Sequence, residues 1–75
     1  MNNTPVDRMK SINSKIKRLR LERNYTQDYL ALKLNISQNA YSKLELGHSK
    51  LSLERLMQIA EVLEVDITIF FNEQD

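Results

Sequence analysis

Apolar residues recur at helical spacing over much of the chain, and the first such stretch begins near residue 12. Ile12, Ile16 and Leu19 lie at i, i+4 and i+7, which places them on one face of an α-helix. Ser11 comes directly before them and is a good N-cap, because its hydroxyl can accept a hydrogen bond from an N–H of the first turn. The pattern therefore predicts a helix over about residues 12–23.

A second long stretch begins after Ser52, which is also suited to an N-cap. Apolar residues follow it at helical spacing: Leu53, Leu56, Ile59, Ala60 and Leu63. They predict a helix as far as residue 63 with these side chains in the core. Met57 lies beside the stripe, where methionine usually fills core space but can also belong to a partner surface.

Between these two stretches, residues 26–47 predict two short helices joined by a tight turn. Thr26 is suited to cap the first of them. Its apolar residues share one face at i, i+1 and i+4 spacing: Leu30, Ala31 and Leu34. Asn35 can end this helix, because asparagine tolerates the left-handed conformation that ends helices.

The second short helix, over about residues 38–46, has two chemically different faces. Ser37 is suited to begin it and Gly47 to end it. At about 100° per residue, the apolar residues point to one side: Ala40, Tyr41 and Leu44. The opposite side carries Gln38, Asn39, Ser42, Lys43 and Leu46. Glutamine and asparagine amides can bond adenine in a bidentate way and lysine reaches guanine acceptors, so this side suits the base edges of DNA.

The last apolar stretch, residues 65–71, allows two interpretations. It alternates as a strand does and is rich in β-branched and aromatic residues, but a lone strand has nothing to pair with inside this chain. In either form, exposed apolar side chains here predict contact with a second copy of the chain. We expect the dimer surface to comprise Met57, Ile69, Phe70 and Phe71.

Length and composition restrict the class of protein. A chain of 75 residues predicts one domain with a small core. Residues 1–10 are polar with one proline and predict a flexible N-terminal arm, which leaves residues 11–75 as the domain. With no Cys and one His, no thiolate or zinc site is plausible, and no apolar run is long enough to span a membrane. We expect a cytoplasmic protein with no metal, no cofactor and no evident small-molecule ligand.

Charge is divided unequally along the chain, although the net charge is only +1. Residues 1–50 carry ten Lys or Arg against four Asp or Glu, a net +6, whereas residues 51–75 carry one Arg against six acidic residues, a net −5. The basic part contains the two short helices, so it would face phosphates, and salt should weaken such binding steeply.

The order and spacing of these segments resemble the Cro/repressor-type helix-turn-helix family, also called Xre or lambda-repressor-like. The segments are T-Q-x-x-L-A-x-x-L at 26–34, I-S at 36–37, Y-S-K-L-E-x-G at 41–47 and S-L-E-x-L-x-x-I-A at 52–60. The resemblance covers about residues 11–71 and implies an all-α, compact five-helix bundle containing a helix-turn-helix. It also implies a short fifth helix capped by Asp66, so for residues 66–71 we choose helix over strand.

The resemblance implies roles for particular residues. Gln27 matches a glutamine that bonds a phosphate, and Arg20 with Glu45 matches a partly buried ion pair between two helices. The base-reading positions fall on Gln38, Asn39, Ser42 and Lys43. We expect contacts to the DNA backbone from Gln27, Lys17, Arg20, His48, Ser49 and Lys50. Asn35, Tyr41, Leu46 and Leu51 depart from the usual family pattern. Leu46 stands where a polar side chain often touches the backbone, so we do not carry that contact over.

These features favour a sequence-specific regulator of transcription, a repressor that binds double-stranded DNA as a homodimer on a palindromic operator. The alternative is an antitoxin-like or other interaction module whose main partner is another protein. An enzyme is disfavoured, because no catalytic residues can be assigned: the carboxylates are scattered, no nucleophile lies beside a base, and one Gly cannot make a phosphate loop. A purely structural bundle would explain the apolar stripes but not the polar face at residues 38–43.

Overall fold

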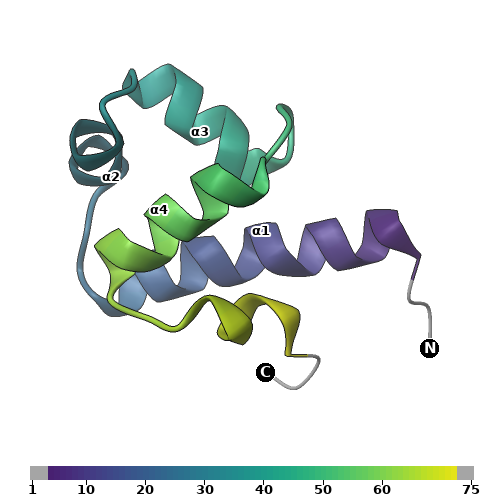
Figure 1. Cartoon of the computed structure of the whole chain (residues 1–75). Helices are drawn as coiled ribbons and strands as arrows, with labels where there is room; N and C mark the ends of the chain where they lie inside the picture. The colour runs from purple at the N-terminus through teal and green to yellow at the C-terminus, as the bar shows by residue number, and fades with distance from the viewer. Residues whose placement is uncertain (1–3, 73–75) are drawn as a thin grey trace.

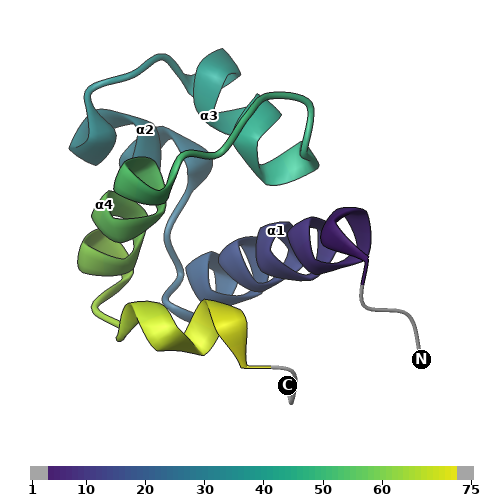
Figure 2. The same ribbon diagram turned by 45° about the vertical axis from the view of Figure 1, so that its right-hand side comes forward.

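The computed structural model describes residues 4–72, which fold into four α-helices and a final 3-10 helix. They are α1 (Pro5–Glu22), α2 (Gln27–Leu34), α3 (Gln38–Leu46), α4 (Leu53–Leu63) and η1 (Ile67–Phe71). Residues 4–72 contain no strand, so the predicted all-α fold is confirmed. α2 and α3 lie at one end of the molecule, and η1 lies at the opposite end beside α1 (Figures 1 and 2).

The first helix begins at Pro5, not near Ile12 as the sequence predicted. Thr4 is its N-cap, and the Thr4 hydroxyl accepts a hydrogen bond from the Asp7 N–H at 3.1 Å. Proline suits the first helical position because its missing N–H needs no partner there. Residues 5–10 are therefore the first turns of α1, and the expected arm is wrong over this range. Residues 1–3 of that arm lie outside the described residues.

The helices α2, α3 and α4 begin and end at the residues that the sequence predicted. The hydroxyls of Thr26, Ser37 and Ser52 each accept a backbone N–H at 3.0 Å, which satisfies one donor in the first turn of α2, α3 and α4. Asn35 ends α2 with φ +59°, and Gly47 ends α3 with φ +79°. These caps are local, so the sequence could indicate them.

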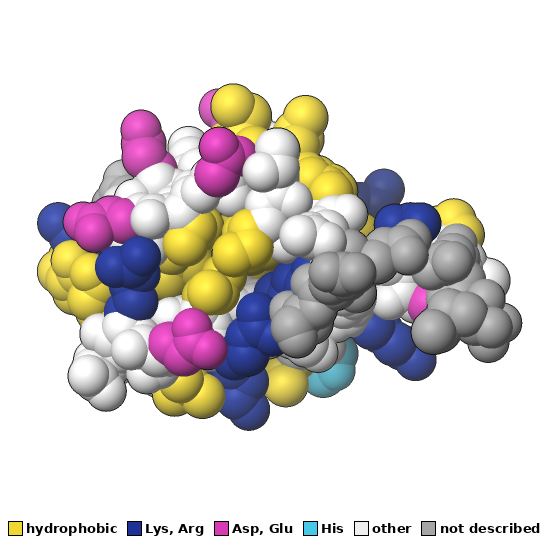
Figure 3. Space-filling view, turned by 90° about the horizontal axis from the view of Figure 1, so that it is seen from below, with side chains coloured by type: hydrophobic (Ala, Val, Ile, Leu, Met, Phe, Trp, Pro, Cys, Tyr) yellow, Lys and Arg dark blue, Asp and Glu magenta, His cyan; other side chains and the backbone are white. Residues whose placement is uncertain are grey.

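The C-terminal stretch forms a 3-10 helix, which rules out the strand interpretation for residues 67–71. The Asp66 side chain begins it by accepting from the Thr68 N–H at 2.9 Å. η1 packs on α1 and α4, and the buried Lys15 of α1 donates from Nζ to the Ile69 carbonyl at 3.1 Å and to the Asn72 carbonyl. Figure 3 looks from below onto this end of the molecule, where hydrophobic side chains reach the surface between charged ones.

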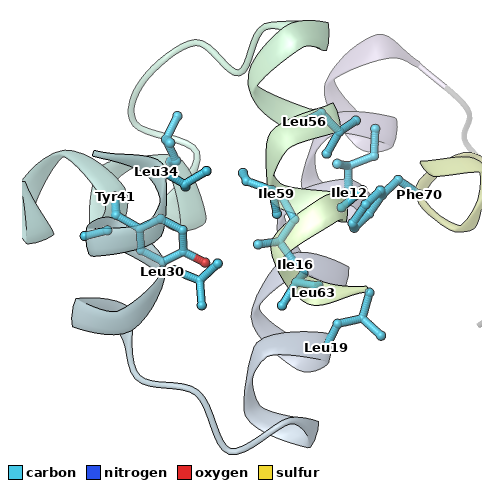
Figure 4. Packing of buried hydrophobic residues seen from close by; sticks show 13 residues of the cluster. Ile12, Ile16, Leu19, Leu30, Leu34, Tyr41, Leu56, Ile59, Leu63 and Phe70 are labelled. Carbon is cyan, nitrogen blue, oxygen red and sulfur yellow. The ribbon is translucent and has the colours of Figure 1, made fainter. Parts of the chain in front are cut away.

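The core lies between α1, α4 and the α2–α3 pair. Its largest side chains include Ile16, Leu30, Tyr41, Ile59 and Leu63, all almost completely buried (Figure 4). Two predictions about this core were wrong. Leu53, expected inside, is 62% exposed, because it lies at the first position of α4, ahead of the turns that meet the core. Phe70, expected at a dimer surface, is 2% exposed and belongs to the core with Ile12 (Figure 4).

Candidate nucleic-acid interface

Helix α3 presents its polar side outward because its other side is fixed in the core. Tyr41 and Leu44 are buried, and α3 packs against both α2 and α1. The predicted base-reading residues lie on the opposite side: Gln38, Asn39 and Lys43 are exposed and Ser42 is half-buried. The structure therefore places all four on one side of α3.

A buried ionic network fixes α3 against α1. Arg20 donates from Nε to Glu45 Oε2 at 2.5 Å and from Nη2 to Glu45 Oε1 at 3.2 Å. Tyr41 donates its hydroxyl to Glu45 Oε2 at 2.6 Å, and Gln27 donates from Nε2 to Glu45 Oε1 at 3.2 Å. The carboxylate thus receives donors from α1, α2 and α3. A charge buried in this way needs such partners, because the interior cannot replace its water.

The network determines the ionisation of its members. Burial by itself would raise the pKa of Glu45, but hydrogen bonds from Arg20, Tyr41 and Gln27 outweigh it and leave this pKa below its usual value. The bond to Glu45 raises the pKa of Arg20, and burial raises the pKa of Tyr41. At neutral pH the site therefore holds a carboxylate, a guanidinium and a neutral phenol.

Arg20 is committed to this network and does not lie at the surface. Its side chain also donates from Nη1 to the Tyr25 carbonyl at 2.8 Å, and the residue is only 6% exposed. Of the two roles expected for Arg20, the structure places it in the ion pair and leaves no access for a phosphate. The backbone assignment of Arg20 is therefore corrected.

The other expected backbone residues are accessible. Gln27 is half-buried at the first position of α2, and Lys17 is exposed on α1. An amide nitrogen carries two hydrogens, so the bond from Gln27 to Glu45 leaves a second donor for a phosphate oxygen. This arrangement connects the α2 terminus to the network that holds α3.

The loop after α3 is exposed at His48, Ser49 and Lys50. The His48 N–H donates to the Lys43 carbonyl at 2.8 Å, which ties the loop to the last turn of α3. Gly47 suits the bend on two counts: its φ is +79°, and a Cβ there would lie 2.8 Å from Asn13 Nδ2 on α1. The loop and α1 thereby border a shallow groove that includes Met9 and Asn13.

Two polar residues in this structure were missed in the sequence. Tyr41 was expected inward as an apolar residue, but its hydroxyl is a partner of Glu45. The i, i+4 spacing of these two residues on α3 could have indicated the bond. Lys15 does not belong to the apolar stripe of Ile12, Ile16 and Leu19, yet it is buried beneath η1. Only its distant partners, the carbonyls of Ile69 and Asn72, explain this burial.

Other kinds of site find no support among residues 4–72. They contain no group of three or more His, Cys, Asp or Glu side chains that could hold a metal ion. None of the described helices is both long and apolar enough to cross a bilayer.

Known proteins are similar to this chain over most of its length. The helix-turn-helix family model matches residues 16–70. The HTH-type transcriptional regulator RamB of Mycobacterium tuberculosis is 34% identical over 64 residues, which is 85% of this chain but 14% of RamB. RamB from a second strain of that organism matches equally well.

A solved structure has the same fold. It is a crystal structure of a mutant of the restriction-modification controller protein C.Esp1396I, with 34% sequence identity and a TM-score of 0.77. The match covers 85% of this chain and 83% of the controller chain. The similarity to the controller protein extends over most of both chains. By contrast, this chain spans only about one seventh of the length of RamB.

Proposed function

Because the chain belongs to the helix-turn-helix family, we propose that it is a sequence-specific, double-stranded-DNA-binding regulator of transcription. It acts in the cytoplasm as a homodimeric repressor on a palindromic operator. The observation that carries the proposal is the exposed polar side of α3. The opposite side of the same helix is buried, and its Glu45 is bonded to Arg20 of α1, so the polar side faces outward. A regulator of this kind needs no catalytic group.

Base recognition is assigned to α3. Gln38 and Asn39 carry amides that can bond adenine, Lys43 reaches guanine acceptors, and the Ser42 hydroxyl bonds either kind of edge. The helix lies in the major groove, where every base pair presents a distinct pattern of donors and acceptors.

Phosphate contacts are assigned to residues around α3. Gln27 at the start of α2, Lys17 on α1 and the loop residues His48, Ser49 and Lys50 bind the backbone and fix the register of α3. The net +6 of residues 1–50 supports this orientation, since basic residues displace counterions from DNA. Affinity should fall steeply with added salt.

The dimer surface is assigned to the α4–η1 end of the molecule. Met57 and Phe71 are exposed and Ile69 is half-buried, whereas Phe70 belongs to the core and is not part of this surface. Met57 also borders a groove between α4 and η1 that includes Val65 and Ile67, with Glu54 and Glu61 at its edges. A two-fold dimer would place its recognition helices about 34 Å apart, one turn of DNA.

The test is a selection from a random DNA library with the purified chain at two salt concentrations. A palindrome should be recovered, and Lys43→Ala should relax one symmetric pair of positions at a cost of about 1–3 kcal/mol. Lys33→Ala, an exposed lysine on α2, is the matched control and should leave the preference profile unchanged.

Sedimentation of the chain and of Phe71→Asp tests the dimer separately. The wild type should sediment as a dimer and the variant as a monomer with weaker operator binding. Salt-sensitive binding without an enriched sequence would refute sequence recognition. In that case a protein partner at the α4–η1 surface, the interaction-module alternative, would be the function to pursue.

A further inference from the structure

The buried Lys15 of α1 is bonded to the end of η1, which lies beside α1 (Figures 1 and 2). Lys15 is 2% exposed, and its Nζ donates to the Ile69 carbonyl at 3.1 Å and to the Asn72 carbonyl. Both acceptors lie at the C-terminal end of η1, where a helix lacks N–H donors for its last carbonyls and where its dipole favours a positive charge. Lys15 therefore supplies, from another helix, the donor at which η1 ends.

Filling space in the core does not explain why a charged side chain lies here. Removing a positive charge from water is costly, and an apolar side chain of similar volume is often at least as stabilising. A lysine adds direction, because its donors require two particular carbonyls to lie in reach. Such a requirement is useful where a short segment carries side chains that must point in a fixed direction.

η1 is such a segment, because it is too short to keep its shape alone. It is a 3-10 helix of five residues, and helices of this length are not stable in isolation. Phe70 fixes the rotation of η1 by its burial in the core. Successive side chains of a 3-10 helix are about 120° apart, so Ile69 and Phe71 are turned away from the direction of Phe70, and Phe71 is 51% exposed. The bonds from Lys15 fix the position of the C-terminal end.

We propose that Lys15 is a positioning residue for self-association: by fixing the end of η1, it holds Ile69 and Phe71 in the orientation that a second copy of the chain contacts. The inference rests on the proposed homodimer and extends it to a buried residue that cannot itself touch the partner. A two-fold interface uses the same surface on both copies, so the effect of Lys15 enters twice. Without its bonds, η1 must be ordered as the dimer forms, and that cost weakens association.

The test compares the dimer dissociation constants of wild type and Lys15→Met by sedimentation equilibrium without DNA. Methionine keeps an unbranched stem in the core and removes the donor. A lost hydrogen bond corresponds to a factor of about five in each copy, so the dissociation constant should rise by up to about 25-fold. Lys15→Arg keeps a positively charged donor and should self-associate more tightly than Lys15→Met.

Arg55→Met is the matched control. The partly buried Arg55 also donates to a backbone carbonyl, that of Leu34 at 3.3 Å, but this bond joins α4 to α2 and does not involve η1. The control therefore removes one positive charge and a bond of the same kind from a different part of the fold. It should lower the stability measured by urea unfolding and leave the dimer dissociation constant unchanged.

Fluorine NMR tests whether η1 is still in place in the variant. The chain has two phenylalanines, Phe70 and Phe71, and both lie in η1, so 4-fluorophenylalanine supplies one buried probe and one exposed probe. Phe71→Leu assigns the two signals. In Lys15→Met, the Phe70 signal should keep the chemical shift of the folded wild type. The Phe71 signal should report the change from monomer to dimer at a higher concentration than in wild type.

The outcomes separate this inference from the proposed function. If wild type is monomeric at every concentration, the proposed homodimer is refuted and the role of Lys15 with it. If wild type dimerises and Lys15→Met dimerises equally tightly, the homodimer stands and only the role of Lys15 is refuted. An equal loss in Arg55→Met would also refute it, since reduced stability alone would then explain the effect. A Phe70 signal that is no longer buried in Lys15→Met would refute a positioning role, because Lys15 would then hold the core as a whole.

Discussion

Replacing Glu45 by glutamine should destabilise the fold far more than an exposed charge substitution would. Glu45→Gln keeps the size of the side chain but removes the charge that compensates Arg20, which is itself buried at 6% exposure. Removing one partner of a buried ion pair costs about 3–5 kcal/mol. We expect about 3 kcal/mol, the lower limit, because the amide oxygen can still accept one bond from Arg20.

The assay is urea unfolding followed by circular dichroism, with the slope of the transition checked against wild type. Glu22→Gln is the matched control, since Glu22 forms only an exposed i, i+4 pair with Arg18 at 3.7 Å. That change should cost about 0.5 kcal/mol or less. A loss below about 1 kcal/mol for Glu45→Gln would refute the view that the pair is desolvated.

The same pair predicts a dependence on pH. The carboxyl of Glu45 has a lower pKa in the folded chain than the ordinary value of 4.5. Its contribution is therefore fully present above pH 4.5 and is lost as the pH falls through the folded pKa. The difference in stability between wild type and Glu45→Gln should shrink only in that acidic range. A difference that changed between pH 6 and 8 would point to another group.

Two further substitutions test other parts of the fold. Lys15→Met keeps the buried stem but removes the donor to the Ile69 and Asn72 carbonyls, so it should cost about 1–3 kcal/mol and increase hydrogen exchange in η1. Exposed Lys17→Met is its control, and equal exchange in the two variants would contradict the role of Lys15. Gly47→Ala should cost about 1–2 kcal/mol for the left-handed conformation, plus a clash with Asn13 Nδ2. In thermal melts, adding Asn13→Ala should recover only the clash; full recovery would show that the backbone conformation is not strained.

Much of the candidate interface could be predicted from the chain. The helical spacing of Tyr41 and Leu44 predicted that Gln38 and Asn39 lie on the outward side of the helix. In the structure both of these residues are exposed. The pairing of Arg20 with Glu45 came instead from the family resemblance, because the two residues lie far apart in the sequence. The burial that removes Arg20 from the phosphate-facing surface followed from neither. It depends on the Tyr25 carbonyl, which accepts from the guanidinium, and on Glu45, which Gln27 and Tyr41 hold beside it.

Helix ends and faces depend on neighbours within a few residues, and for these the sequence was sufficient. Thr26, Ser37 and Ser52 cap their helices as predicted, because a hydroxyl at the N-cap reaches an N–H only three residues ahead. Pro5 is a local indication of the same kind for the start of α1, since proline favours the first helical position. The polar composition of residues 1–10 led instead to the incorrect prediction of an arm.

Burial at the edges of the helices was decided only by the tertiary structure. Leu53 was expected in the core and Phe70 at an exposed dimer surface, yet Leu53 is exposed and Phe70 is in the core. Lys15 carries a charge and is nevertheless buried. In each case the outcome depends on which distant segment packs there. η1 covers Lys15 and places Phe70 beside α1, whereas the buried residues of α4 begin only at Leu56. Periodicity defines a face, but the partner that covers that face is fixed only when the chain folds.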